Sequence, residues 1–296
     1  MGAPRDTIWS VRFRLPPSQA ELVANALAAD AVSLCCWQAV DTDRTDCEVF
    51  CRSRSGTKAT RAALVSTLAA LELDLPQFET VEAPNQDWRS AWQRFFHPEN
   101  VSPRLVVAPP WERPPPGGDR HVIVIDPGMS FGTGQHPTTR ACLALIDELA
   151  DPASQASFLD LGCGSGILAV AAAKLDYAPI VAIDQDPVAV GKAKENLALN
   201  GEVSSVECRV CGVGELDLPY RADLVAANIL ASVLIEAADA IVSCVAPGGR
   251  LILSGILDEQ YSEVRTAFEG RGLRECNSRL VEAWRTGLFS RARQPR

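Results

Sequence analysis

A run of closely spaced glycines constrains this chain more than any other feature of its sequence. The short apolar stretch Phe158–Leu161 leads into glycines at positions 162, 164 and 166, and an alanine-rich helical segment starts directly after them. A buried parallel strand passes into a crossover helix in this way, through a loop that lets a ligand approach the backbone. A second apolar run, Ile180–Ile183, ends in Asp184, where a carboxylate can accept both hydroxyls of a ribose. Together these features predict a site for a nucleoside-containing cofactor.

The spacing of the glycines distinguishes two kinds of cofactor. A dinucleotide fingerprint, G-x-G-x-x-G, needs its third glycine at position 167, which is Ile167. The spacing present, Gly162-x-Gly164 with a third glycine two residues later, resembles the loop that binds S-adenosylmethionine. Asp184 supports this interpretation. Its alternative function, as the cap of the next helix, is disfavoured because Asp186 already supplies that cap.

Apolar runs and helix-forming segments alternate through the C-terminal part of the chain, as they do around a parallel sheet. A long helix is expected to end at Val245, and Pro247–Gly249 should then turn the chain. The last two strands should form an antiparallel hairpin. The expected strands are residues 158–161, 180–183, 205–210, 222–227, 250–253, 275–284 and 287–290. This pattern is typical of a class I methyltransferase, an α/β, Rossmann-like fold with a seven-stranded sheet.

The first 84 residues have a different order of elements. Strands are expected at residues 8–15, 32–40, 47–53 and 78–82, and helices at 19–30 and 57–73. The order β-α-β-β-α-β is typical of a small ferredoxin-like α+β domain. Because it shows no catalytic constellation, we interpret residues 1–84 as a substrate-recognition domain, with a purely structural domain as the alternative. A helical connector with a Pro-rich loop should follow over residues 85–120, and the catalytic domain over residues 121–296.

Asn228 should end the fourth strand of the large sheet, at the crevice where open α/β sheets hold their ligands. The run Ala227–Ala231 (ANILA) resembles a reduced form of the amino-methyltransferase motif, in which Asn or Asp precedes two prolines. A carboxamide oxygen there can accept a hydrogen bond from a substrate amine. That bond directs the lone pair of the amine nitrogen at a methyl group. We therefore favour Asn228 as a catalytic residue, with a helix cap as the alternative. His136 is a candidate general base but fits a loop-fixing residue equally well, and water could take the proton.

Three segments together resemble one known family. Residues 131–139 (FGTGQHPTT), the glycine stretch and residues 228–231 (NILA) are similar to those of the bacterial methyltransferases of ribosomal protein L11. The similarity covers nearly the whole chain, and the first motif is the most specific. It implies repeated methylation of lysine and N-terminal amines on a basic ribosomal protein. By match to the family's motifs, the contacts to S-adenosylmethionine fall on Thr139, Gly162, Asp184 and Asn228.

The composition favours a cytoplasmic enzyme with a basic partner. A net charge of −9 disfavours non-specific binding of nucleic acid or of an anionic membrane. The chain opens without a signal-peptide pattern, and its most apolar helical segment, Ile229–Val245, carries charged residues, so we expect no membrane span. The ten cysteines are scattered like reduced thiols. Cys208 and Cys211 lack a second pair with ligand spacing, so no metal is expected. We also expect a monomer.

Alternative functions stay open at this point. A nicotinamide-dependent oxidoreductase would use a similar sheet, but Ile167 and the antiparallel end of the sheet disfavour it. A cofactor-binding scaffold without activity would have no need of Thr139, Asp184 and Asn228 together. A methyltransferase could also act on lysines of a different protein, since the cysteine-rich N-terminal domain shows no motif that matches the family closely.

Overall fold

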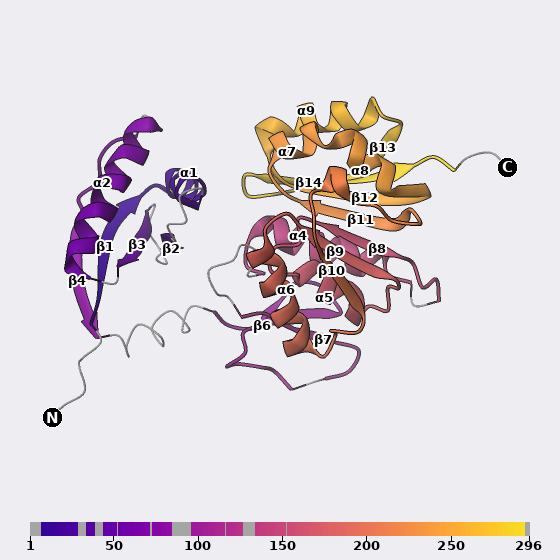
Figure 1. Cartoon of the computed structure of the whole chain (residues 1–296), viewed down its shortest axis with the longest axis horizontal. Coiled ribbons are helices and arrows are strands. Elements are labelled where there is room, and N and C mark those ends of the chain that lie inside the picture. Colours follow the sequence, from indigo (N-terminus) through magenta and orange to yellow (C-terminus); the bar gives the residue numbers. More distant parts are fainter. Residues whose placement is uncertain are drawn as a thin grey trace. The chain divides into compact units, whose positions relative to one another are not determined.

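The computed structural model describes residues 7–28, 34–38, 44–51, 53–71, 73–84, 96–115, 117–126, 134–151 and 153–293. The chain forms two compact units, Met1–Phe95 and Phe96–Arg296 (Figure 1). Each unit has its own hydrophobic core. Two features expected from the sequence lie outside the described residues: the aromatic helical connector at residues 86–95, and residues 131–133 of the first family motif.

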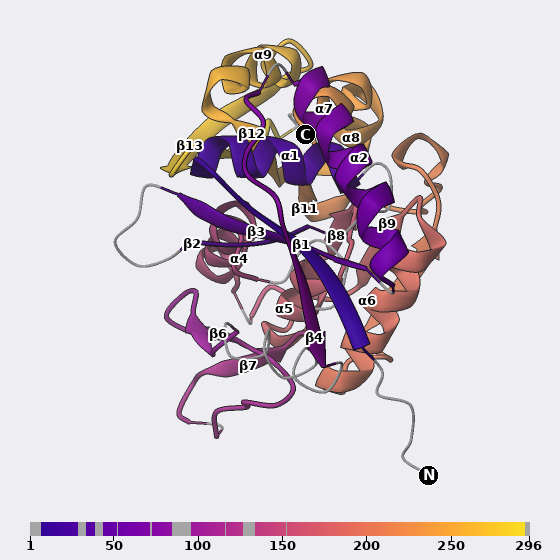
Figure 2. The same cartoon turned by 90° about the vertical axis from the view of Figure 1, so that its left-hand side faces the viewer.

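The N-terminal unit is a four-stranded antiparallel sheet with two helices packed on one face. Its elements are β1 (Thr7–Leu15), α1 (Pro17–Ala28), β2 (Leu34–Gln38), β3 (Thr45–Cys51), α2 (Arg54–Ala70) and β4 (Glu79–Pro84). The sheet order is β2-β3-β1-β4, and Figure 2 shows these strands beside both helices. Alternate residues of β1, Val11, Phe13 and Leu15, are buried with Leu27 of α1 and Leu64 of α2. The structure confirms the expected ferredoxin-like element order.

The C-terminal unit contains a seven-stranded sheet in the order β10-β9-β8-β11-β12-β14-β13. Its strands are β8 (Phe158–Leu161), β9 (Ile180–Asp184), β10 (Val206–Val210), β11 (Ala222–Asn228), β12 (Val245–Leu257), β13 (Leu273–Val281) and β14 (Trp284–Arg291). Only β14 runs antiparallel to its neighbours within this sheet. From β8 the chain adds β9 and then β10 toward one edge of the sheet. It then returns to place β11 on the other side of β8. A ligand crevice is expected at such a switch point, at the carboxyl ends of β8 and β11.

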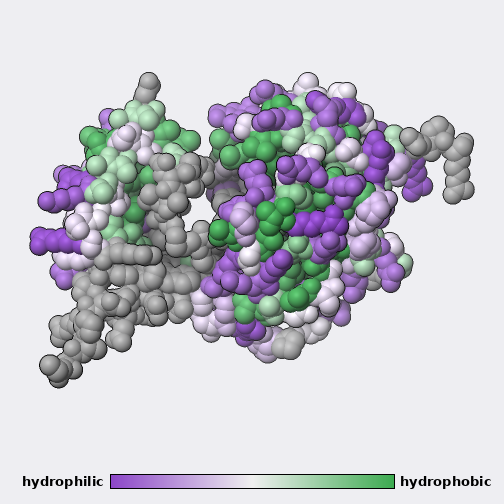
Figure 3. Space-filling model, viewed as in Figure 1, coloured by the Kyte–Doolittle hydropathy of each residue, from purple (hydrophilic) through white to green (hydrophobic). Residues whose placement is uncertain are grey.

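Helices cover both faces of this sheet, and the three layers are visible in Figure 1. One face carries α4 (Pro137–Leu149), α5 (Ile167–Lys174) and α6 (Pro187–Asn200), and the other carries α7 (Ala231–Glu236), α8 (Ala238–Cys244) and α9 (Asp258–Glu269). Helix α5 is buried over most of its length because its alanines allow it to lie close to the sheet. Figure 3 shows hydrophobic residues lying among hydrophilic ones on the surface of this unit. The structure confirms the expected class I methyltransferase fold.

Three details of the sequence prediction were wrong. The strand expected at residues 275–284 runs past the hairpin turn, since β13 ends at Val281 and β14 begins at Trp284. The long helix that should have ended at Val245 is two short helices, because the backbone at Ala237 leaves the helical region (φ −89°, ψ 8°). Buried Leu234 and Ile241 lie on either side of the break, so the apolar pattern alone resembles one continuous helix. Residues Pro247–Gly249 do not end a helix with a turn but lie inside β12, where the β11–β12 ladder is irregular.

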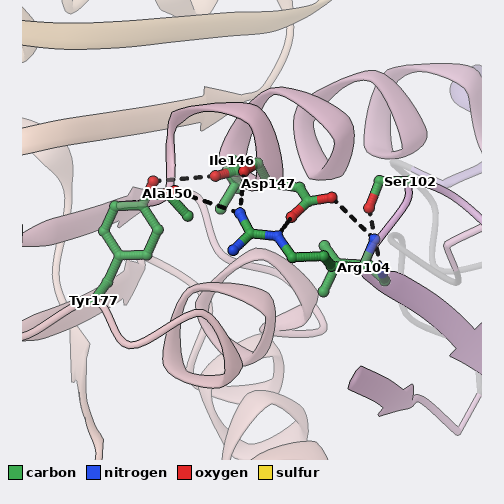
Figure 4. Close-up of polar contacts among 7 residues, drawn as sticks. Ser102, Arg104, Ile146, Asp147, Ala150 and Tyr177 are labelled. Atoms are coloured by element: carbon green, nitrogen blue, oxygen red, sulfur yellow. Dashed lines mark hydrogen bonds and ion pairs between the residues drawn. The ribbon is translucent and has the colours of Figure 1, made fainter. Parts of the chain in front are cut away.

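A further three-stranded sheet precedes α4, and only its last strand is predicted by the sequence, from the apolar run at residues 121–125. It contains β5 (Glu99–Asn100), β6 (Leu105–Ala108) and β7 (His121–Val124). Its β6 is fastened to the C-terminal end of α4 by Arg104 (Figure 4). The Arg104 guanidinium donates from Nε to Asp147 Oδ1 at 2.5 Å and from Nη2 to the carbonyl of Asp147 at 2.5 Å, and the Tyr177 hydroxyl donates to the carbonyl of Ile146. These donors occupy carbonyls that a helix end leaves unpaired.

Candidate cofactor and acceptor site

The loop of residues 162–166, the glycine loop, requires glycine for two separate reasons. Gly162, Gly164 and Gly166 all have positive φ (72°, 51° and 76°), where a side chain would be strained. A Cβ on Gly162 would lie 2.4 Å from Ile229 Cγ2, and one on Gly166 would lie 2.8 Å from Ala193 Cβ. The loop is therefore packed between β11 and α6, with its backbone close to the carboxyl edge of the sheet.

Asp184 at the end of β9 is tied directly to this loop. Its Oδ2 accepts a hydrogen bond from the Gly164 N–H at 3.0 Å, and its Oδ1 accepts one from the Asp186 N–H at 3.0 Å. The cap of α6 is Asp186, whose carboxylate accepts from the Val188 N–H at 2.8 Å. Asp184 therefore does not cap that helix. Each of its partly exposed carboxylate oxygens has a second lone pair with which to accept a hydroxyl.

Asn228 at the end of β11 meets the first turn of α4. Its Nδ2 donates to Thr139 Oγ1 at 3.4 Å, whereas its Oδ1 is buried and has no hydrogen-bond partner among the described residues. The helix-cap alternative is wrong, because α7 begins at Ala231 and its N-cap is Leu230, without any side-chain cap. A buried carboxamide oxygen with no partner is costly unless a ligand supplies the missing donor.

His136 is the N-cap of α4. Its Nδ1 lies 2.7 Å from Thr138 Oγ1 and accepts from the Thr138 N–H, and its ring packs edge-on against Trp284 at 5.0 Å. Of the two functions left open by the sequence, the loop-fixing one agrees with these contacts. His136 thereby orients the turn that carries Thr139.

Asp160 is a polar residue of this region to which the sequence analysis assigned no function. It lies in the middle of β8 and is 1% exposed, and its Oδ2 has no hydrogen-bond partner among the described residues. Burial and, to a lesser extent, the negative charge of Asp184 raise the pKa of Asp160 to about 7, against a hydrogen bond from the Ala169 backbone N–H that lowers it. An acidic residue within the apolar run Phe158–Leu161 was the signal that could have revealed it.

These groups fit S-adenosylmethionine. Asp184 offers acceptors for ribose hydroxyls, the glycine loop offers close backbone approach, and the unpartnered oxygens of Asp160 and Asn228 suit donors on a cationic ligand or amine. No group of three or more metal-ligating side chains occurs within the described parts of the chain. Cys208 and Cys211, which have C-x-x-C spacing, are both free thiols. A shallow depression at the ends of β6 and β7 is lined by none of the predicted site residues.

Comparison with known proteins identifies the family. The family model described as ribosomal protein L11 methyltransferase matches residues 21–291. The chain belongs to the ribosomal protein L11 methyltransferase family. It is similar to the enzymes of that name from Pelobacter propionicus (42% identity over 225 residues, 75% of this chain and 72% of the relative) and Symbiobacterium thermophilum (40% over 220 residues, 74% and 70%). Among solved structures it is similar to the ribosomal protein L11 methylase of Lactobacillus delbrueckii subsp. bulgaricus, with 30% identity and a TM-score of 0.61 over 67% of this chain and all of that chain.

Family membership confirms the resemblance seen in the sequence and makes the protein a methyltransferase. The nicotinamide oxidoreductase and the inactive scaffold are thereby set aside. The contacts of Thr139, Gly162, Gly164, Asp184 and Asn228 to a cofactor stay predictions, although the structure brings these residues together at one edge of the sheet. No helix in the described part of the chain is both long enough and apolar enough to span a membrane.

Proposed function

We propose that this protein uses S-adenosylmethionine to methylate lysine and N-terminal amines of ribosomal protein L11. The family supports the substrate protein and the type of reaction. The choice of amines as acceptors is supported above all by Asn228 beside the glycine loop, because no described residue donates a hydrogen bond to its buried Oδ1. An amine N–H is the kind of donor that this oxygen requires.

When bound, S-adenosylmethionine supplies an electrophilic methyl group on a sulfonium. Asp184 would hold the ribose hydroxyls, and its carboxylate accepts a hydrogen bond from Gly164 that keeps the glycine loop in place. Gly162 and Gly164 carry no side chains and would let the cofactor approach the backbone of the loop, and Thr139, which accepts a hydrogen bond from Asn228, would contact it as well. The protein thus contributes binding and orientation rather than covalent chemistry.

Transfer is an in-line displacement in which Asn228 aligns the acceptor. Its Oδ1 would accept a hydrogen bond from one amine N–H and so orient the nitrogen lone pair. The bound cofactor would supply the methyl group and keep the electron pair of its S–C bond on sulfur. Such alignment can contribute roughly 7–11 kcal/mol. The amine must first be neutral, which costs roughly 4–5 kcal/mol near pH 7 for a lysine of pKa about 10.4 and about 1 kcal/mol for an α-amine.

Water is the proposed acceptor of the proton that leaves the amine. His136 is engaged with Thr138 and packs on Trp284, so its position serves the turn of α4. We therefore propose that water accepts the proton, either before binding or as the methyl group is transferred. Activity should then rise with pH as more of the acceptor amine becomes neutral.

The N-terminal unit is proposed to bind L11. It has a separate core and carries none of the residues that line the candidate site. A substrate that presents several amines in turn to one site needs a binding surface away from the reaction. Action as a monomer in the cytoplasm, without direct binding of nucleic acid, stays a prediction.

The experiment is to incubate the purified full-length protein with methyl-labelled S-adenosylmethionine and unmethylated L11, and to locate the label by mass spectrometry. Label on lysine Nζ and on the N-terminal nitrogen supports the proposal. Matched substrates, L11 with acetylated lysines and L11 with an acetylated N-terminus, should each lose only their blocked sites. Label on oxygen, sulfur or carbon atoms would overturn the proposal, and so would methylation of another protein in a cell extract while L11 stays unlabelled.

A further inference from the structure

Two buried hydroxyl groups lie directly behind Asn228. Ser254 on β12 is opposite Asn228 in the parallel β11–β12 ladder, and its Oγ lies 2.6 Å from Thr286 Oγ1 on β14. Both residues are fully buried, at 0% and 1% exposure. Ser254 Oγ also donates to the carbonyl oxygen of Thr138 at 3.4 Å, so Thr286 is the donor within the hydroxyl pair. The pair therefore connects the centre of the sheet to the first turn of α4.

Packing alone does not explain why two hydroxyl groups lie at this buried position. Ile252 and Leu288, which lie two residues along the same strands and in the core under α4, are apolar, and burying a hydroxyl that loses its hydrogen bond costs roughly 1–3 kcal/mol by mutational data. Alanine at position 254 or valine at position 286 would avoid that risk with little change of shape. Two hydroxyls at this depth call for a contact that apolar side chains cannot make. The carbonyl of Thr138 is one such contact, and the thiol of Cys142, also on α4, is another hydrogen-bond partner of Ser254.

The residue that Ser254 contacts is next in the chain to the residue that holds Asn228. Thr138 precedes Thr139, whose hydroxyl accepts the hydrogen bond from Asn228 Nδ2. That bond determines how the carboxamide is oriented, since Nδ2 is held by Thr139 and Oδ1 has no partner among the residues that the structure describes. If the first turn of α4 moved away from the sheet, Asn228 could rotate and Oδ1 would no longer point at the acceptor amine.

We propose that Ser254 and Thr286 are positioning residues for methyl transfer. Their hydroxyl pair holds the first turn of α4 through the Thr138 carbonyl, and Thr139 in turn holds the carboxamide of Asn228 with Oδ1 toward the amine. This inference rests on the proposed function of Asn228 as the group that aligns the acceptor. A displacement of about 1 Å in such an arrangement can cost about a hundredfold in rate, so even a partial loss is measurable.

The test compares Thr286→Val, which keeps the shape of the side chain but removes the hydroxyl, with Thr286→Ser, which keeps the hydroxyl but removes a methyl group. Both are made in the full-length protein and assayed at saturating S-adenosylmethionine and L11. We expect kcat to fall about tenfold in the valine variant and by less than about twofold in the serine variant. Ser254→Ala should match the valine variant. A serine variant as slow as the valine variant would show that packing matters instead and would overturn the inference.

A second measurement separates positioning from general stability. In an Asn228→Ala background, Thr286→Val should change kcat by less than about twofold, because the group through which it acts is gone. The matched control is Ser157→Ala, which removes a buried hydroxyl bonded to Asp223 at the opposite, amino edge of the same sheet. It should lower the melting temperature without lowering kcat. If Asn228→Ala lowers kcat but Thr286→Val and Ser254→Ala do not, this inference fails while the proposed function stands. An unchanged kcat in Asn228→Ala itself would instead remove the proposed function of Asn228.

Discussion

The carboxylate of Asp184 accepts a hydrogen bond from the backbone N–H of Gly164 at 3.0 Å, across 20 residues of sequence. The second carboxylate oxygen accepts from the N–H of Asp186. Two fixed backbone donors hold the carboxylate at the end of β9, and the remaining lone pairs are available to a ligand. Asp184 thus both orders the glycine loop and offers acceptors for ribose hydroxyls.

Replacement of Asp184 by alanine should weaken binding of S-adenosylmethionine by roughly ten- to a hundredfold with the fold intact, because a hydrogen bond to a charged acceptor is worth about 1.5–3 kcal/mol. Calorimetry measures the affinity. The matched control is Asp186→Ala, which removes the same charge two residues away but affects only the cap of α6. Equal affinities for wild type and Asp184→Ala would exclude this assignment.

Replacement of Asn228 by alanine should lower kcat more than it weakens cofactor binding. The lost interaction aligns the amine in the transition state, so KM for L11 should change less than kcat. Initial rates at varied L11 concentration, together with a binding titration of S-adenosylmethionine, check this outcome. If kcat and the affinity for S-adenosylmethionine fall by the same factor, Asn228 acts as a cofactor contact only.

Asp160 should make the stability of the ligand-free protein fall as the pH rises. Its pKa is raised from an ordinary value of 3.8 to about 7 by burial, so between these values the unfolded chain has released the proton while the folded chain still holds it. The contribution of this group is therefore most favourable below about pH 4 and is lost progressively up to about pH 7. Asp160→Asn stays neutral throughout. Urea unfolding at pH 5 and pH 8 should show the variant gaining stability relative to wild type at the higher pH; the same difference at both values would contradict the assignment.

Loss of Arg104 should destabilise the C-terminal unit. The Asp147 carboxylate is 4% exposed and would remain buried without its charged partner, keeping, among the described residues, only the backbone N–H of residue 104 as a donor; loss of one partner of a buried ion pair typically costs about 3–5 kcal/mol. Arg104→Lys should recover only part of this, because one ammonium cannot bond the carboxylate and the helix-end carbonyl with the geometry of the guanidinium. Thermal unfolding measures the loss. In an Asp147→Ala background, Arg104→Ala should lower the melting temperature much less. An undiminished loss would show that Arg104 stabilises the unit through a contact other than Asp147.

A chain that begins at Asn85 should still bind S-adenosylmethionine but should methylate intact L11 far more slowly than the full-length protein. The predicted cofactor contacts all lie in the Phe96–Arg296 unit, whereas the proposed recognition surface lies in the Met1–Phe95 unit. Short amine-bearing peptides should lose less rate, since they depend less on remote binding energy. Circular dichroism first establishes that the shortened chain is folded. If both forms methylate intact L11 at the same rate, the N-terminal unit has another function.

The sequence alone determined the order of the elements, the class of the fold and the glycine loop with Asp184. These depend on consecutive residues: an apolar run of four or five residues makes a buried strand, and glycines with positive φ make the turn that follows it. Asn228 was predictable in the same way, because it ends the fourth apolar run of the sheet. Local patterns also misled where burial continued across a break, as at Ala237.

The tertiary structure alone decided which polar side chains meet. Asn228 bonds Thr139 across 89 residues, and Ser254 reaches Thr138 across 116 residues. The unpartnered oxygen of Asp160 likewise became visible only once its surroundings were known. The physical reason is that burial patterns are periodic along the chain, whereas hydrogen-bond partners depend on which strands and helices the fold places side by side. The sequence therefore predicted where the site lies, and the packing of α4 against β11 and β12 determined how its side chains are held.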